Sequence, residues 1–396
     1  MAGFLWMVAW GMMAVGLVLL LSKLVARRFN KNKPVLVTGD ECKMAVLIPA
    51  RDESAVIGGL LDSLARQSVI LDFKNVYVIV ERQDDPTVEI CKEYGAEVIV
   101  RQNLAGQRKG YALAEGVEKI LDAGKHYDVY FFFDADNRLT PNYLERMRKV
   151  YFRGYDMGVG RRRILNPKTA VAVGSGLIFT IINGIVNKSR SQHQMNCIIS
   201  GTGFYIAGRI LEKMGTYPFH SLTEDYELSL YATVEGLATY YAASAEFYDE
   251  QPESYAQYFR QRTRWVKGYF EARKEFRGRM WRKLKLGNGN FVSVYDALIG
   301  IYDILLMVIV VVLMMVAVII NGDLVWFNLL GILAVVYLVL MIFSVILLGM
   351  ERLKLSFKLE IMVILIHPLL LVTYVPCFVV AICRKDVGWK RIEHKG

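Results

Sequence analysis

The sequence is poor in cysteine, and it lacks the motifs that mark nucleic-acid-binding proteins. Its five cysteines are scattered along the chain, and no two of them form a C-x-x-C pair. This pattern favours free thiols in a reducing compartment over a disulfide framework. The chain also has no zinc finger, basic zipper or RNP-like motif, so we expect no nucleic acid partner.

Apolar and basic residues, by contrast, are in excess. Hydrophobic residues make up 54% of the chain and its mean hydropathy is +0.30. Lysine and arginine total 48 against 38 aspartates and glutamates, which gives a net charge of +10. With 396 residues, the chain has room for a folded domain and membrane segments together. An apolar yet basic composition indicates an integral membrane protein with cationic cytoplasmic flanks.

The N-terminal segment predicts a membrane anchor over residues 1–27. Residues 3–25 are nearly uncharged and long enough to cross a bilayer, which takes about 20 residues. The segment lacks a basic start and an A-x-A-like cleavage site, which favours an uncleaved anchor over a signal peptide. The basic stretch "KLVARRFNKNK" follows it, so we expect the next domain to lie in the cytoplasm.

A second apolar region, residues 294–384, predicts C-terminal transmembrane helices. The expected spans are residues 299–320, 324–348 and 360–383. The loop before the last span and the tail, residues 385–396, are both basic and should be cytoplasmic. One anchor plus three spans, however, would place the tail outside. Two explanations stay open: Pro368 splits the last segment into two half-helices, or an apolar stretch lies in the membrane interface.

Residues 40–268, between the two apolar regions, have the pattern of an α/β domain. Strands are expected at "MAVLIPA", "NVYVIVE", "AEVIVR" and "DVYFFFDAD", with helical patterns between them. Continuous apolar runs are typical of parallel strands that are covered on both faces. The alternation predicts a doubly wound, mostly parallel sheet. Ligands of such sheets bind beyond the carboxyl ends of the strands.

Acidic residues follow three of the expected strands. Asp134 and Asp136 end one of them, and both would point the same way if the strand is still extended there. Their oxygens suit Mg²⁺ or Mn²⁺ together with substrate phosphates. Glu53 and Glu81 follow two other strands. Carboxylates at one edge repel each other without a cation or hydrogen-bond donors, although each alone is also explained by an exposed loop.

Two basic stretches suggest anion binding. Arg108 and Lys109 stand at a helix start, which makes an anion site or a solvated basic turn. Arg264 can bind a diphosphate through its planar fork, and Trp265 offers a flat face for a sugar ring. The alternative for this second stretch is a basic amphipathic helix on the membrane. Residues 269–293 are expected to form such an interfacial segment.

The stretch "SLTEDYELSLYA" offers a candidate general base. Asp225 can accept a proton from an attacking hydroxyl, whereas the structural alternative is a helix start capped by Thr223. The stretch "SGTGFYIAG", residues 200–208, has small residues that let the backbone approach a substrate or form a tight turn.

Taken in order, these motifs resemble those of membrane-embedded family 2 glycosyltransferases, the group of cellulose, hyaluronan and poly-N-acetylglucosamine synthases. The motifs are "IPARDE", "VERQDDPT", "KGYAL", "DADN", "GTGF", "TED" and Q-x-x-R-W, followed by membrane helices. The resemblance implies a GT-A fold and an inverting transfer from a nucleotide sugar, expected to be a UDP-sugar. Two positions depart from the pattern: Asp52 stands where many members have Asn, and Glu81-Arg82 replaces the usual Asp pair.

The resemblance also implies roles for individual residues. Asp225 would be the catalytic base, and Asp134 and Asp136 would bind the nucleotide and Mg²⁺ or Mn²⁺. The implied substrate-binding residues are Ala50, Arg51, Glu53 and Glu81 toward the nucleoside, Lys109 and Asp134 toward the nucleotide, and Gln261, Arg264 and Trp265 toward the diphosphate and acceptor sugar.

Three functions remain open at this point. The Q-x-x-R-W motif favours a synthase that extends a polysaccharide at the membrane. The small number of expected spans favours transfer of a single sugar to a membrane lipid. A transporter or receptor with a nucleotide-binding domain would need charged groups inside its spans, and His367 is the one ionisable group deep in the last span.

Overall fold

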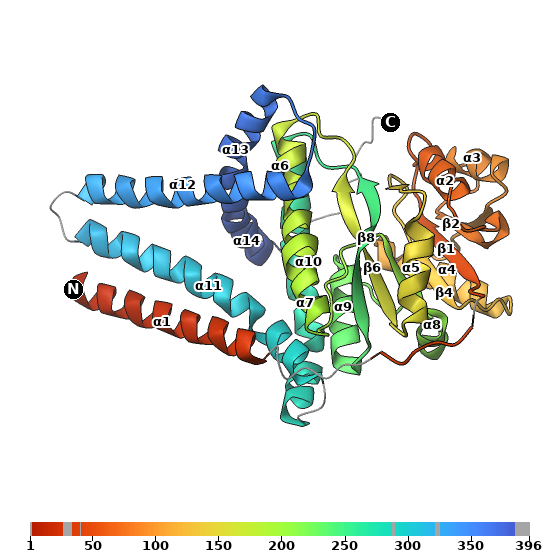
Figure 1. The fold of residues 1–396 in the computed structure, drawn as a ribbon, viewed down its shortest axis with the longest axis horizontal. Helices are drawn as coiled ribbons and strands as arrows, with labels where there is room; N and C mark the ends of the chain where they lie inside the picture. Colours follow the sequence, from red (N-terminus) through yellow and green to blue (C-terminus); the bar gives the residue numbers. More distant parts are fainter. Residues whose placement is uncertain (1, 27–33, 40, 287–289, 321–324, 385–396) are drawn as a thin grey trace.

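The computed structural model describes residues 2–26, 34–39, 41–286, 290–320 and 325–384. An α/β domain lies at one end of the molecule, and long apolar helices project from the other (Figure 1). The basic stretch at residues 27–33 and the tail at residues 385–396 lie outside the described residues.

The core of the domain is an eight-stranded sheet in the order β3-β2-β1-β4-β7-β6-β8-β5. Its first half matches the predicted alternation of strands and helices. The strands of this half are β1 (Met44–Pro49), β2 (Val76–Val80), β3 (Glu97–Val100) and β4 (Val129–Phe132), and the helices between them are α2 (Ile57–Ala65), α3 (Thr87–Glu93) and α4 (Lys109–Asp122). All three strand pairings in this half are parallel. The residues of β1, β2 and β4 are almost completely buried, as continuous apolar runs predict.

The second half of the sheet is mixed, so the expected mostly parallel sheet holds only for the first half. Its strands are β5 (Arg138–Leu139), β6 (Met157–Ile164), β7 (Phe204–Ala207) and β8 (Thr239–Asp249). Strand β7 pairs antiparallel with both β4 and β6, while β6 pairs parallel with β8. Antiparallel strands need no crossover helix of their own, so the repeating β-α signal is lost here.

Further helices cover this sheet and connect it to the apolar helices. They are α5 (Tyr143–Phe152), α6 (Ala170–Phe179), the π-helical stretch η3 (Thr180–Asn187), α7 (Lys188–Gln192), α8 (Gly208–Met214) and α9 (Glu224–Glu235), with a short 3₁₀ turn at Phe73–Asn75 before β2. The sequence analysis did not single out the apolar segment Ala170–Gln192. It is apolar and long enough to cross a membrane, yet 61% of its most apolar window is buried inside the protein.

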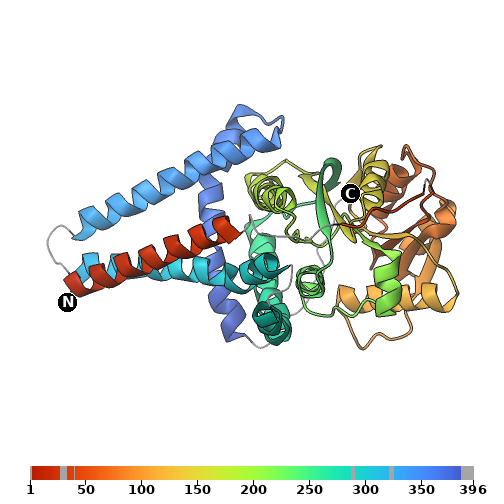
Figure 2. The same cartoon turned by 60° about the horizontal axis from the view of Figure 1, so that its bottom comes forward.

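The remaining long helices are α1 (Ala2–Ala26), α10 (Tyr255–Leu286), α11 (Phe291–Ile320), α12 (Val325–Glu351), α13 (Phe357–Val372) and α14 (Tyr374–Cys383). Helices α1 and α11 lie side by side in both views of the ribbon (Figures 1 and 2). Segments Leu333–Glu351 and Phe357–Cys383 are each apolar and long enough to span a bilayer.

The last apolar segment divides at Thr373 and not at Pro368. Pro368 lies inside α13, whereas Pro376 lies in the first turn of α14. A proline has no N–H to donate to the carbonyl four residues earlier, which weakens the helix around Thr373. Helix α10 runs without interruption from Tyr255 to Leu286, so no helix end marks the expected domain boundary at residues 268 and 269.

Gly110 is tightly packed and helps to place the start of α4. A Cβ there would overlap the carbonyl oxygen of Phe219. We expect Gly110→Ala to lower the free energy of unfolding by about 1–3 kcal/mol, the usual cost of overpacking. The matched control is Gly278→Ala in α10, where a Cβ meets nothing within 4 Å. Alanine favours a helix over glycine by about 1 kcal/mol, so this control should unfold at the same temperature or higher. Equal thermal unfolding of the two variants would contradict the packing.

Candidate active site

A cavity of about 890 Å³ lies at the carboxyl ends of β1, β2 and β4, the edge predicted to bind ligands. Helices α6, α9 and α10 contribute to its walls. Every site residue that the sequence analysis named lines this one cavity: Ala50, Arg51, Glu53, Glu81, Lys109, Asp134, Asp136, Asp225, Gln261, Arg264 and Trp265.

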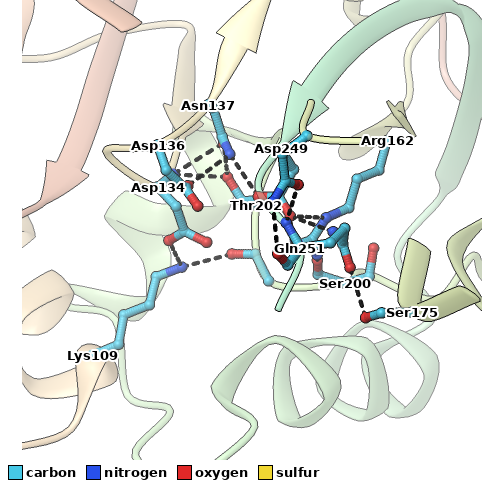
Figure 3. A network of polar contacts seen from close by, with 12 residues as sticks. Lys109, Asp134, Asp136, Asn137, Arg162, Ser175, Ser200, Thr202, Asp249 and Gln251 are labelled. Carbon is cyan, nitrogen blue, oxygen red and sulfur yellow. Dashed lines mark hydrogen bonds and ion pairs between the residues drawn. The ribbon is translucent and has the colours of Figure 1, made fainter. Parts of the chain in front are cut away.

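Three carboxylates meet on one side of the cavity, and we call Asp134, Asp136 and Asp249 the acid trio (Figure 3). Each offers an oxygen within 4.8 Å of the others. Strand β4 ends at Phe132, so Asp134 and Asp136 converge in a turn and not along an extended strand as expected. Asp249 ends β8 and was missed from the sequence. The sequence analysis expected no strand there, because β8 is only partly buried and has no unbroken apolar run.

The acid trio is held by surrounding hydrogen bonds. Asn137 donates through its side-chain amide to Asp136 (3.2 Å) and to Asp249 (2.8 Å). Arg162 donates to Asp249 through Nε (2.9 Å) and through a second guanidinium nitrogen. Burial raises the pKa of Asp249, and the charge of Arg162 opposes that rise. Hard carboxylate oxygens gathered this closely are the ligands that Mg²⁺ and Mn²⁺ prefer, so the trio can hold a divalent cation.

Lys109, at the start of α4, connects the acid trio to the opposite wall. Its ammonium donates to Asp134 Oδ1 (2.5 Å) and to the Gly201 carbonyl (2.7 Å), and it lies 3.7 Å from Glu224. Burial alone lowers the pKa of Lys109. The charges of Asp134, Glu224 and Asp225 outweigh burial and raise the pKa above its ordinary value. Lys109 therefore stays charged inside the cavity.

Two adjacent acids, Glu224 and Asp225, begin α9 on that opposite wall. Burial raises the pKa of Glu224 to about 7, although the charge of Lys109 opposes the rise. Burial also raises the pKa of Asp225, and backbone hydrogen bonding, Lys109 and Arg162 oppose it. Carboxylates with raised pKa values in a cavity are suited to proton transfer near neutral pH. Thr223 precedes α9, but its hydroxyl makes no capping hydrogen bond within the described part of the chain.

The glycines of the "GTGF" stretch bring backbone close to these acids. Gly201 has φ +82°, a conformation that favours glycine, and a Cβ there would lie 3.6 Å from Asp225 and 3.9 Å from Arg162. Thr202 accepts a hydrogen bond from the Asp134 amide (2.8 Å). A side chain at position 201 would therefore narrow the space between Asp225 and the acid trio.

The far end of the cavity has alternating charges. Glu81 pairs with Arg51 and accepts from Arg101 (3.2 Å), which is nearly buried. The backbone of Glu53 donates to Thr87 (2.9 Å), and this bond fixes the loop after β1. Arg108, the other half of the expected anion site, donates to Glu271 of α10 (2.9 Å).

Residues of the Q-x-x-R-W motif form the wall nearest the apolar helices. Gln261 Oε1 and Arg264 Nε are buried and have no hydrogen-bond partner among the described residues. The fully buried Arg262 lies 3.9 Å from the centre of the Trp265 ring, a cation–π contact. Trp265 also packs edge-on against Phe179 of α6. The sequence analysis missed Arg262, and its place between two motif residues was the available signal.

A chain of hydrogen bonds connects this wall to the acid trio. Arg262 donates to the Ser175 hydroxyl (2.7 Å), and Ser175 contacts Gln251 (3.0 Å). Gln251 in turn donates to Asp249 (2.9 Å), as Figure 3 shows for the part from Ser175 onward. The ring of Trp265 and the carboxylate of Asp249 are therefore positioned by one connected set of side chains.

Curated proteins with related sequences are glycosyltransferases by name. A probable glycosyltransferase, YdaM, of Bacillus subtilis is 29% identical over 240 residues, which cover 57% of this chain and 55% of the relative. A beta-monoglucosyldiacylglycerol synthase of Synechocystis is 22% identical over 257 residues, 61% of this chain and 52% of the relative. The chain thus matches only about half the length of these relatives.

Among solved structures, a mannosyltransferase of Pyrobaculum calidifontis, PcManGT, in complex with GDP-Man and Mn²⁺ has a similar fold. The superposition has a TM-score of 0.61 at 13% identity and covers 96% of this chain and 100% of the other. The sheet, the helices around it and this match show a GT-A fold. The profile of the family described as glycosyltransferase like family 2 matches residues 42–268, more than half of the sequence. The chain belongs to glycosyltransferase family 2.

Proposed function

We propose that this enzyme moves a sugar from a nucleoside diphosphate sugar to an acceptor hydroxyl at the membrane, with inversion at the transferred carbon. One observation supports the proposal most. The acid trio, Lys109 and the raised-pKa carboxyl of Asp225 line the same cavity. Such a cavity places charge stabilisation for a leaving diphosphate opposite a group that can accept a proton.

The donor is proposed to lie between the alternating charges at Glu81 and the acid trio. Arg51, Glu81 and Arg101 offer both donors and acceptors to a nucleobase and ribose. Asp134, Asp136 and Asp249 would hold Mg²⁺ or Mn²⁺, which would neutralise charge on the diphosphate when bound. The similar mannosyltransferase holds GDP-Man, so screening for donor hydrolysis should cover GDP-sugars beside the UDP-sugars that the motifs favour.

The protein's own groups perform the remaining steps. Lys109 stays protonated beside Asp134, and Arg264 lies half-buried on the facing wall, so both can stabilise the leaving diphosphate. Asp225 removes the proton of the acceptor hydroxyl as the hydroxyl attacks the sugar carbon. A single displacement of this kind inverts the configuration at that carbon. Helices α6, α9 and α10 form the walls against which the acceptor would lie.

The acceptor is proposed to be a growing glycan, with a membrane lipid as the alternative. The Trp265 face, held by Arg262 and Phe179, supports a sugar acceptor. The apolar lining residues Ile182 and Ile198 support a lipid, as does the relative named a beta-monoglucosyldiacylglycerol synthase. Incubation of membranes with a labelled nucleotide sugar separates the two. A ladder of large products on a gel supports the glycan, and a single organic-soluble product supports the lipid.

Localisation follows from the apolar helices. We propose that α1, α11 and α12 cross the membrane and that the α/β domain is cytoplasmic. Exposed apolar side chains cover α1 and the described part of α12, among them Met7, Val18, Val335 and Val339. Burying this apolar surface in lipid is favourable, whereas exposing it to water costs free energy.

Replacing the proposed base should stop transfer without stopping donor binding. We expect Asp225→Asn to lower the transfer rate by roughly 10²–10⁴-fold, since it removes the proton acceptor. Calorimetry should give an unchanged nucleotide affinity. Asp122→Asn, an exposed carboxylate at the end of α4, is the matched control and should keep full activity. Full transfer activity in Asp225→Asn would remove this residue as the base.

Replacing members of the acid trio should remove metal-dependent nucleotide binding. We expect Asp136→Ala and Asp249→Asn each to weaken nucleotide affinity in Mn²⁺ by at least about tenfold. Loss of a residue that only supports a metal ligand already weakens metal affinity by about this factor. In EDTA, the variants and the parent should bind equally, because the trio then holds no cation. Calorimetry in both buffers checks this. Unchanged affinity in Mn²⁺ for both variants would refute the metal site.

As the pH is lowered, the transfer rate should begin to fall at a higher pH than is usual for a carboxylate base. The pKa of Glu224 is raised to about 7 and that of Asp225 is raised in the same buried pair. Because the base must be ionised, the rate should rise as pH increases toward and through neutrality. Glu224→Gln should move this rise to lower pH, since it removes a competing negative charge. A rate that is level down to pH 4 in the parent would contradict the assignment.

A further inference from the structure

Helices α13 and α14 expose one continuous apolar stripe. Its members recur every three or four residues, which places them on one face of the helical segment. The stripe consists of Phe357, Ile361, Leu365, Leu369, Val372, Val375, Val379 and Ile382, which are all between 42% and 78% exposed. The opposite face, with Val363, Leu370, Cys377 and Ala381, is buried against the protein.

This segment runs across the direction of the proposed spanning helices. In both views, α13 and α14 run across α1 and α11 and follow α6 and α10 along the edge of the α/β domain (Figures 1 and 2). Two contacts near the middle of the segment hold this arrangement. Tyr258 of α10 donates to the Leu370 carbonyl (2.9 Å), and Gly174 of α6 is so close to Leu370 that a Cβ there would meet its side chain at 2.6 Å.

The helix beside α14 is too polar to lie in the hydrocarbon core. Helix α10 is rich in Lys and Arg, and one of its cations, Lys267, lies against α14. Lys267 donates to the Ala381 carbonyl (3.1 Å) and the Arg384 carbonyl (2.9 Å) at the end of α14. Arg260, on the same helix, is exposed. Placing a charged side chain at the bilayer centre costs several kcal/mol. Helix α14 must therefore lie at a depth where the charged side chains of α10 can reach water or lipid head groups.

The turn between α12 and α13 is also surrounded by charged and polar side chains. Glu351, the last residue of α12, is buried and pairs with Arg163 of β6 (3.0 Å), and the Thr180 hydroxyl donates to it (2.9 Å). Arg163 also donates to the Glu351 carbonyl (2.6 Å), which caps the end of α12. Arg352 then adopts φ +54°, and Ser356 caps α13. The chain thus turns sharply directly after Glu351.

We propose that α13 and α14 lie along the cytoplasmic surface of the membrane, with the apolar stripe immersed at the boundary between head groups and acyl chains. The proposal rests on the membrane placement of α1, α11 and α12 given above. Three spans and one surface segment leave the basic tail, residues 385–396, on the side of the α/β domain, as its charge requires. This resolves the conflict between span number and tail charge.

The placement has a consequence for the acceptor. Helix α6 packs directly on α13 through Val173, Leu177 and Val363. The end of α6, Phe179, and Ile182 of η3 line the cavity. The cavity is therefore one helix layer away from the inner leaflet. A lipid-linked acceptor would reach Asp225 without leaving the membrane surface.

Depth measurements along the stripe test this directly. Spin labels at Ile361, Leu365, Leu369, Val372 and Val379, one at a time in a cysteine-free variant in vesicles, report depth through relaxation by oxygen and by a nickel chelate. We expect similar, shallow depths at all five positions. Labels at Val335 and Val345 of α12 are the control and should differ in depth. A spanning segment would change depth by about 12 Å between Ile361 and Leu369, from a rise of 1.5 Å per residue. Such a profile, or full exposure to the nickel chelate, would overturn the proposal.

Sidedness gives an independent check. Cys383 is exposed at the end of α14, and Lys354 is exposed just before α13. A membrane-impermeant maleimide should label Cys383, and Lys354→Cys introduced in a variant lacking Cys383, only after intact cells are opened. Labelling of one position in intact cells and the other only after opening would show a spanning segment. That result would overturn the membrane placement but not the proposed catalysis. The proposed catalysis is tested separately, by the nucleotide-binding and Asp225→Asn experiments.

Discussion

The acid trio imposes the constraint on which the rest of the site depends. Three carboxylates whose oxygens lie within 4.8 Å of one another repel strongly in a buried place. The fold answers that repulsion with positive charge from two directions, Lys109 at the start of α4 and Arg162 on β6. Both cations are already paired, so they hold the geometry together. Hard carboxylate oxygens gathered this closely would hold a divalent cation that arrives with substrate.

The sheet topology converts this local balance into a site. Asp134 and Asp136 follow β4, Asp249 ends β8, and Lys109 starts the helix that precedes β4. Parallel pairing of β1, β2 and β4 brings their carboxyl ends to one edge, and the mixed second half brings the end of β8 to the same cavity. The hydrogen-bond chain through Gln251, Ser175 and Arg262 then extends from Asp249 to Trp265. Donor and acceptor walls are consequently parts of one polar network, which favours a single arrangement of the site.

How much of this was readable from the sequence depended on the kind of signal. The parallel half of the sheet was predictable because buried strands leave unbroken apolar runs. Predicted site residues that follow strands, such as Glu81 and Asp134, line the cavity because the strand ends converge. Asp225 and Trp265 lie on helices, and only their sequence motifs pointed to them. Asp249 and Arg162 were missed because their strands, β8 and β6, are only partly buried and leave no unbroken apolar run. The segment Ala170–Gln192 was also missed as an element. Its apolar side chains pack against α13 and do not follow the pattern of a strand. The stacking of Arg262 on Trp265 joins two residues three positions apart on α10, so helical spacing could have indicated it.

Only the folded sheet brings the turn after β4, with Asp134 and Asp136, next to Asp249 at the end of β8, and the proposed divalent cation would lie between them. The most direct measurement is anomalous diffraction from crystals grown with Mn²⁺ and a nucleoside diphosphate. The account predicts an anomalous peak bounded by the carboxylates of Asp134, Asp136 and Asp249, with the diphosphate between that peak and Lys109. A nucleotide bound in the cavity with the manganese peak elsewhere, or with no manganese, would contradict it.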